Sequence, residues 1–164
     1  ALDLSARALR CAAPRSLTLL ATRAAVAAGR YPRAASTLRL LERAGKTWET
    51  DLLGARIAYE RRDPEALRAR LEACVDEVPR ELSEALLEVV ALLERTERGE
   101  EALRVLREAR APTPLLRLTR AHFEALYGEP GQARVELEAA LSREPELRRR
   151  ALADPALRAF MTRD

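Results

Sequence analysis

The sequence is poor in the residue types on which most catalytic and metal sites depend. It has one histidine, His122, and two cysteines, Cys11 and Cys74, while aromatic residues make up 4% of its 164 residues. The cysteines lie far apart and form no CxxC pair, so neither a disulfide framework nor a zinc site is expected. Two small apolar thiols in a reducing cytoplasm are the expected situation. We predict no metal and no cofactor.

Sequence motifs of the common catalytic and nucleotide-binding sites are also missing. The chain holds no G-x-G-x-x-G, P-loop, H-E-x-x-H or G-x-S-x-G segment. Carboxylates are plentiful, but Asp63, Glu65, Glu100 and Glu101 lie at turns and helix starts, where a negative charge favours the helix dipole. We therefore predict that the protein is not an enzyme.

Charge of one sign does not dominate the chain. The 29 basic and 26 acidic residues give a net charge of +3, and the two signs interleave along nearly every segment. Lys46 is the only lysine, so nearly all of the basic residues are arginine, which indicates a GC-rich coding bias. A nucleic-acid-binding face usually segregates its basic charge, so no direct nucleic-acid partner is expected. No apolar run approaches the roughly 18 to 20 residues of a membrane span, so no membrane partner is expected either.

The sequence is rich in residues that favour helices. Ala, Leu, Glu and Arg dominate, and these are strong helix formers, whereas β-branched and aromatic residues are scarce. Apolar residues recur at helical spacing, as in Leu86, Leu87, Val90 and Leu93, and no strand-length alternation is present. We predict an all-α fold of about ten helices joined by short connections.

Local signals mark where several of these helices begin and end. A capping oxygen stands before a proline, whose missing N–H costs nothing at the first helical position, in three dipeptides: Asp63-Pro64, Thr113-Pro114 and Asp154-Pro155. Gly29 and Gly128 are expected to take the left-handed conformation that closes a helix.

The turns recur at a nearly regular spacing. An alanine follows each turn in a matching frame, and these alanines are Ala34, Ala66, Ala102 and Ala133. A helix pair repeated about every 34 residues, with small residues where helices cross and a proline where a unit ends, resembles the tetratricopeptide repeat (TPR). The Leu-Gly pair of that family is matched literally by Leu53-Gly54, and the other units are degenerate at this position.

This resemblance implies a TPR-like α-solenoid, a right-handed superhelical stack of antiparallel helix pairs within a single domain over residues 1–164. Repeat units are expected at residues 15–46, 47–82, 83–113 and 114–146. Residues 1–14 form an unpaired leading helix, and residues 147–164 form a C-terminal capping helix that solvates the end of the stack.

The resemblance also implies where a partner is bound, because the first helix of each pair lines the groove in that family. Carried onto this sequence, the partner-binding positions are Arg23, Trp48, Asp51, Tyr59, Glu84, Glu88, Thr119 and His122. Their mixed chemistry does not form an asparagine and lysine clamp for a C-terminal carboxylate, so an amphipathic helix or an extended segment is the expected guest.

Two of these positions have a second reading. Trp48 either forms an anchor pocket for a partner together with Tyr59 or packs as an ordinary core residue. His122 is either a satisfied core or groove histidine or a pH-responsive contact.

The leading functional hypothesis is therefore a cytoplasmic scaffold or adaptor that binds a protein or peptide partner. The alternative is a peptide- or ligand-sensing regulatory domain of a larger transcriptional or signalling regulator, suggested by the unpaired leading helix. An RNA-binding helical repeat is a third hypothesis, which Asp51, Glu84 and Glu88 disfavour because it needs a basic groove. The leading helix is also a candidate contact for a homodimer.

Overall fold

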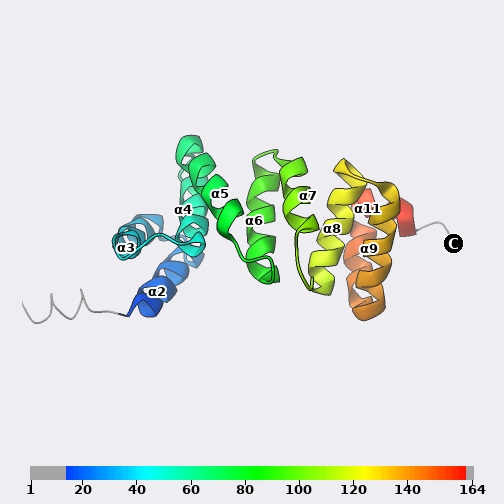
Figure 1. The fold of residues 1–164 in the computed structure, drawn as a ribbon, viewed down its shortest axis with the longest axis horizontal. Helices are drawn as coiled ribbons and strands as arrows, with labels where there is room; N and C mark the ends of the chain where they lie inside the picture. The colour runs from blue at the N-terminus through cyan, green and yellow to red at the C-terminus, as the bar shows by residue number, and fades with distance from the viewer. Residues whose placement is uncertain (1–13, 162–164) are drawn as a thin grey trace, which may run out of the picture. The chain divides into compact units, whose positions relative to one another are not determined.

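The computed structural model describes residues 14–161, and helices dominate throughout that range (Figure 1). Ten α-helices and one 3-10 turn account for the regular structure of these residues, with no strand among them. The predicted all-α fold with about ten helices is confirmed. The predicted leading helix, with its candidate homodimer contact, falls mainly on residues 1–13, which lie outside the described residues, as do residues 162–164.

Eight of the helices form four pairs with a constant internal spacing. The first and second helices begin at positions 15 and 31, 48 and 64, 83 and 99, and 114 and 130, so the offset between them is identical in every pair. Each predicted repeat unit contains one such pair. The pairs are α2 (Arg15–Ala27) with α3 (Tyr31–Arg43), α4 (Trp48–Glu60) with α5 (Pro64–Glu77), α6 (Ser83–Arg95) with α7 (Gly99–Arg107), and α8 (Pro114–Tyr127) with α9 (Pro130–Arg143).

The turn inside each pair explains this spacing. A residue with positive φ stands at the same place in three of the turns: Gly29 at 67°, Arg62 at 56° and Glu97 at 60°. Each of these turns carries the hydrogen bonds of a Schellman motif, such as the bond of 2.8 Å that the Arg30 N–H donates to the Ala25 carbonyl. The left-handed residue reverses the chain within a short turn, so the two helices must run antiparallel.

Gly128, at the equivalent place in the fourth turn, differs from the prediction. Its φ is −128°, so it does not adopt the left-handed conformation expected from the sequence. A Cβ added at Gly128 would clash with the Glu124 carboxylate and lie 2.9 Å from an Arg107 guanidinium nitrogen. The glycine is therefore required for space beside an ion pair, not for backbone handedness.

The predicted helix starts are confirmed at three prolines. The Asp63 carboxylate accepts a hydrogen bond of 3.0 Å from the Ala66 N–H, and the Thr113 hydroxyl accepts one of 3.3 Å from the Leu116 N–H. Asp154 accepts one of 2.9 Å from the Ala156 N–H at the start of α11 (Pro155–Met161).

Contacts divide the chain into two compact units, residues 1–77 and residues 78–164. In the first unit, α2, α3 and α4 share one apolar core. Its members are buried below a tenth of their surface: Ala25, Val26, Ala34, Leu38, Leu53 and Ile57. The prediction that residues 1–164 form one domain stays a prediction.

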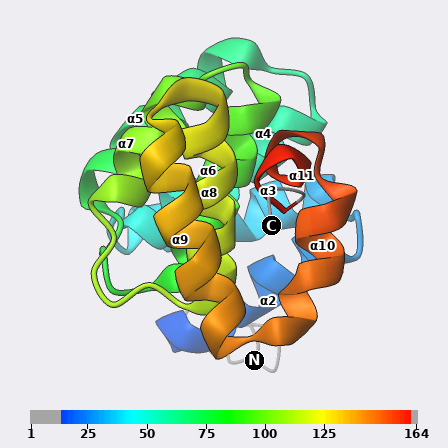
Figure 2. The same cartoon turned by 90° about the vertical axis from the view of Figure 1, so that its right-hand side faces the viewer.

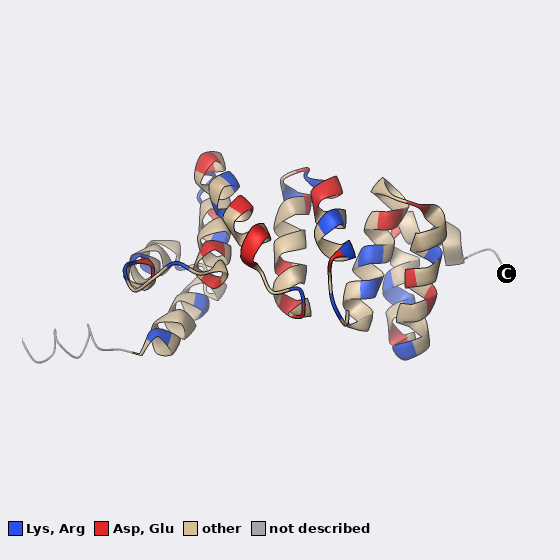
Figure 3. Ribbon diagram, in the orientation of Figure 1, with Lys and Arg blue, Asp and Glu red and all other residues tan. Residues whose placement is uncertain are grey.

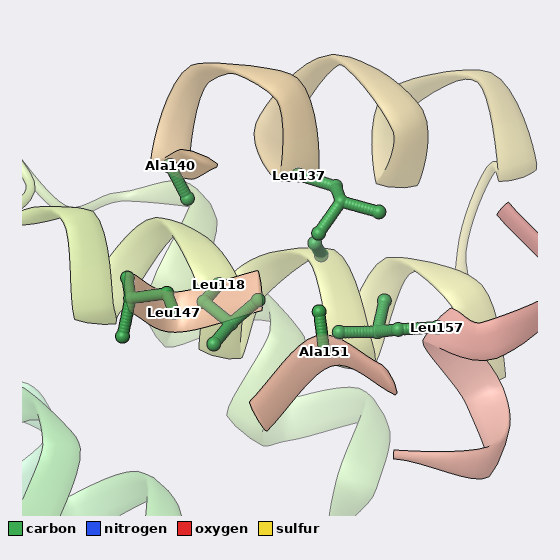
Figure 4. Packing of buried hydrophobic residues seen from close by; sticks show 7 residues of the cluster. Leu118, Leu137, Ala140, Leu147, Ala151 and Leu157 are labelled. Atoms are coloured by element: carbon green, nitrogen blue, oxygen red, sulfur yellow. The ribbon is translucent and has the colours of Figure 1, made fainter. Parts of the chain in front are cut away.

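In the second unit, the C-terminal elements cover the end of the α8–α9 pair (Figure 2). These elements are the 3-10 turn Pro145–Leu147, α10 (Arg148–Ala153) and α11. Their apolar side chains point toward those of α8 and α9 (Figure 4), and the cluster comprises Leu118, Ala121, Leu137, Ala140, Leu147, Ala151 and Leu157. The arginines Arg148, Arg149 and Arg150 are exposed, as expected for a solvated cap.

Ion pairs join the two helices of a pair at equivalent positions. Asp51 on α4 lies 2.7 Å from Arg70 on α5, and Arg117 on α8 lies 2.9 Å from Glu136 on α9. The two pairs have the same separation in sequence, with the signs exchanged. Burial alone would lower the pKa of Arg70, but its contacts with Asp51 and Glu42 outweigh this effect, so the pKa is raised.

The carboxylate of Glu124 on α8 is fully buried. Arg107 on α7 donates two hydrogen bonds to it, at 2.8 and 2.7 Å, and the Glu129 N–H donates a third at 3.2 Å. The bonds from Arg107 lower the pKa of Glu124 below its ordinary value of 4.5, although burial opposes this effect. The Arg107–Glu124 pair thus connects two successive helix pairs of the second unit.

We predict that Glu124→Gln lowers the free energy of unfolding at pH 7 by about 1 to 2 kcal/mol, because Arg107 is half exposed and solvent screens the pair. Since the folded-state pKa is depressed, this stability is present above pH ~5 and is lost as the pH falls through the folded pKa. Urea denaturation of both proteins between pH 7 and pH 3 should therefore show the two curves converging at low pH. Glu138→Gln, at an exposed position on α9, is the control, and a wild-type pH dependence in Glu124→Gln would contradict the account.

We also predict that Arg62→Gly and Glu97→Gly each raise the free energy of unfolding by about 0.5 to 1 kcal/mol. A left-handed non-glycine residue costs roughly 1 to 2 kcal/mol, and the entropic penalty of glycine offsets part of the gain. Arg61→Gly is the matched control, because Arg61 has φ −86° and no such strain to release. Denaturant midpoints should rise for the first two variants and fall for the control.

Candidate protein-binding surface

The helix α2 carries an apolar face that no described residue covers. Leu17 is 57% exposed and Leu20 is 63% exposed. The exposed residues Ala21 and Ala24 continue the same face, because spacings of three and four residues keep them within an arc of about 100°. We call these four residues the α2 stripe.

The α2 stripe is exposed because few residues of α2 are buried in the core. Of the 13 residues in α2, three are buried, whereas eight of the 13 residues in α4 are buried. The buried side of α2, with Thr22, Ala25 and Val26, packs in the core that it shares with α3 and α4. A helix in the interior of a stack is covered on two sides by its neighbours, so the described residues cover less of α2 than of α4.

The hairpin that contains the stripe is strongly basic. Residues 14–47 hold seven basic residues and one acidic residue, a formal charge of +6 (Figure 3): Arg15, Arg23, Arg30, Arg33, Arg39, Arg43 and Lys46, with Glu42. The remainder of the unit, residues 48–77, holds five basic and eight acidic residues. The interleaving of charge expected for the whole chain does not hold for this segment.

The acidic side chains of the described residues leave most of this positive charge unpaired. Glu42 pairs with Arg70 on α5, and Arg23 pairs with Glu49 on α4 at 3.3 Å. The side chain of Arg15 donates to neutral acceptors, the Ala44 carbonyl and the Thr47 hydroxyl.

The outward face of α3 is formed by three exposed arginines, Arg33, Arg39 and Arg43, together with Ser36 and Leu40. Among the residues that the structure describes, no ion pair joins these arginines to an acidic side chain. Their charge is therefore available to a ligand.

Four of the predicted groove residues lie in the first unit. Arg23 is 53% exposed on its side chain and bound to Glu49, while Trp48 and Tyr59 are of intermediate exposure. Asp51 is 5% exposed, and its carboxylate faces Arg70 inside the α4–α5 pair. The Asp51 carboxylate therefore serves packing between helices and is not displayed at a surface.

The other four predicted positions lie in the second unit. Glu84 and Glu88 are both exposed on α6, and the Thr119 hydroxyl donates to the Leu115 carbonyl within α8. His122 Nδ1 lies 2.6 Å from Asp154, the residue that caps α11, and Nε2 lies 3.7 Å from Glu94 on α6. The histidine thus links α8 to the C-terminal elements. The binding role predicted for the eight groove residues stays a prediction.

Two surface cavities accompany these features. One of about 460 Å³ lies between α3, α4 and α5, where Arg70 packs over Gly54. Of the charged groups in its wall, Glu42, Asp63 and Arg70 already have partners within the unit. Arg39 and Arg61 also lie in this wall, and no described acidic side chain pairs with them. The other cavity, of about 400 Å³, lies beside Arg107 and Tyr127 in the second unit. Two arginines without an acidic partner do not by themselves define a small-molecule site, and we assign none to either cavity.

No family model, no curated protein and no solved structure matches this chain. Within residues 14–161, no group of three or more His, Cys, Asp or Glu side chains is arranged to hold a metal ion. The helices of the same residues are too short or too polar for any of them to cross a membrane.

The α2 stripe was not among the residues predicted from the sequence. Periodicity marks Leu17 and Leu20 as apolar helix positions but does not say whether a neighbouring helix covers them. A signal that would have found the basic hairpin is a charge count by segment instead of by whole chain.

We predict that Leu20→Ala changes the free energy of unfolding by less than about 0.5 kcal/mol, because a side chain that is mostly in water contributes little to folding. Leu38→Ala, in the core of the same unit, should cost about 2 to 5 kcal/mol. Urea denaturation of the two variants checks this difference. A large loss of stability in Leu20→Ala would show that residue 20 is part of the core.

Proposed function

We propose that the protein is a helical scaffold of the tetratricopeptide-like kind that binds a segment of another protein along the α2 stripe. We place this binding in the cytoplasm, because the two cysteines are expected to be reduced thiols. The α2 stripe is the observation that carries it, since two leucines that are more than half exposed lie beside two exposed alanines on one helical face.

The repeated helix pair supports the proposal. A constant offset between the two helices of each pair, and a nearly constant step from one pair to the next, are typical of helical repeat proteins. Such proteins act by presenting extended helical surfaces to their partners. Helix-on-helix recognition uses apolar anchors at spacings of three and four residues, and Leu17, Leu20, Ala21 and Ala24 show this spacing.

A photo-crosslinking amino acid at position 20 tests this function in lysate of the source organism. We expect a covalent adduct with another protein at position 20, because the partner lies directly on the stripe. The matched control is the same amino acid at position 135, where Val135 is 56% exposed in the second unit.

An additional Leu17→Asp substitution should abolish the adduct at position 20, because a carboxylate in the stripe opposes apolar docking. Adducts of equal yield at positions 20 and 135, or none at position 20, would contradict the proposed function.

A further inference from the structure

We infer that the segment bound on the α2 stripe is an acidic amphipathic helix, whose apolar side packs on α2 and whose carboxylates lie in the field of the basic hairpin. This inference rests on the proposed function and adds the chemistry of the partner to it.

Charge is the first argument. The hairpin of residues 14–47 has a formal charge of +6, and its single carboxylate, Glu42, is already paired with Arg70. The axes of two packed helices such as α2 and α3 lie roughly 8 to 10 Å apart, and the Debye length at physiological salt is about 8 Å, so the charge of α3 acts at the surface of α2. An acidic ligand on α2 is therefore attracted by the arginines of both helices, and a basic ligand is repelled.

Shape is the second argument. The stripe consists of two leucines followed by two alanines, so its C-terminal half is low and allows another helix backbone to approach closely. Leu17 and Leu20 at the N-terminal half project as anchors for that helix. An extended peptide would find no sheet edge to pair with in residues 14–161, whereas a helix satisfies its own backbone hydrogen bonds.

A second copy of the chain fits this surface poorly. A two-fold contact through α2 would place one hairpin of charge +6 against another. Residues 1–13 carry Arg7 and Arg10 against one carboxylate, Asp3, so they do not supply the negative charge that the hairpin attracts.

Lipid and nucleic acid are less suited to the same features. Interfacial helices that bind anionic membranes insert Trp, Phe or Leu side chains, and the α2 stripe offers two leucines and no aromatic residue. Nucleic acids are bound through phosphate contacts and base stacking, which give no role to an exposed Leu17 and Leu20.

The test uses the full chain and three stapled helical peptides, each long enough to cover α2, with the staple holding them helical at this short length. All three peptides share leucines at helical spacing. Their other positions are Glu in the first peptide, Gln in the second and Lys in the third. Fluorescence anisotropy measures their binding at about 50 and 300 mM NaCl. We expect the Glu peptide to bind roughly tenfold more tightly than the Gln peptide, the Lys peptide to bind weakest, and salt to reduce the preference.

Two variants locate the binding. The triple variant Arg33→Glu, Arg39→Glu, Arg43→Glu should invert the order of the Glu and Lys peptides. The pair Leu17→Ala, Leu20→Ala should weaken all three peptides at least tenfold. A matched control, Arg143→Glu, Arg148→Glu, Arg149→Glu, changes the charge equally at exposed positions of the second unit and should leave the order unchanged. Circular dichroism checks that each variant remains helical.

Several outcomes would overturn the inference. One such outcome is that the Glu and Gln peptides bind equally and both lose binding on the leucine substitutions. That result would leave the proposed function standing but would contradict the inference that the partner is acidic. Failure of all three peptides would also remove it, while the adduct at position 20 decides the proposed function separately. Tighter binding to phosphatidylserine vesicles or to duplex DNA through the same arginines, or a dimer of the chain that requires Leu20, would assign the surface to another occupant.

Discussion

The short turn within each helix pair is the constraint on which the rest of the structure depends. It fixes the offset between the two helix starts, which is the same in all four pairs, and makes the helices run antiparallel. Such a pair buries one side of each helix against its partner and leaves further apolar surface that a neighbouring pair must cover. The Arg107–Glu124 ion pair joins the two successive helix pairs of the second unit. No described helix pair covers the outer side of α2, so the α2 stripe remains exposed.

In the proposed complex, electrostatics give the α2 stripe its selectivity. Exposed leucines alone would bind many apolar segments, since the hydrophobic effect is not directional. The basic hairpin around the stripe adds a long-range preference for negative charge and a penalty for positive charge, including that of a second copy. Apolar anchors and unpaired arginines on one hairpin therefore combine affinity with choice of partner.

Local features of the fold could be predicted from the sequence, and features set by distant contacts could not. The caps at Asp63, Thr113 and Asp154 need neighbours two or three residues away, and they were predicted correctly. Gly128 was assigned the wrong role because its environment is made by Arg107, which belongs to the preceding helix pair. Burial of Asp51 likewise depends on Arg70. Leu17 and Leu20 have the same periodicity as covered leucines, so their exposure needed the structure.

Amide chemical-shift mapping tests the central claim most directly. The chain is labelled with ¹⁵N and titrated with the Glu peptide, and the shift of each assigned amide is followed to saturation. The account predicts that the perturbed amides concentrate in α2 and α3, residues 15–43, with the largest changes beside Leu17, Leu20 and Ala24. Perturbations concentrated in the second unit, or scattered over both units without a maximum in α2, would contradict it.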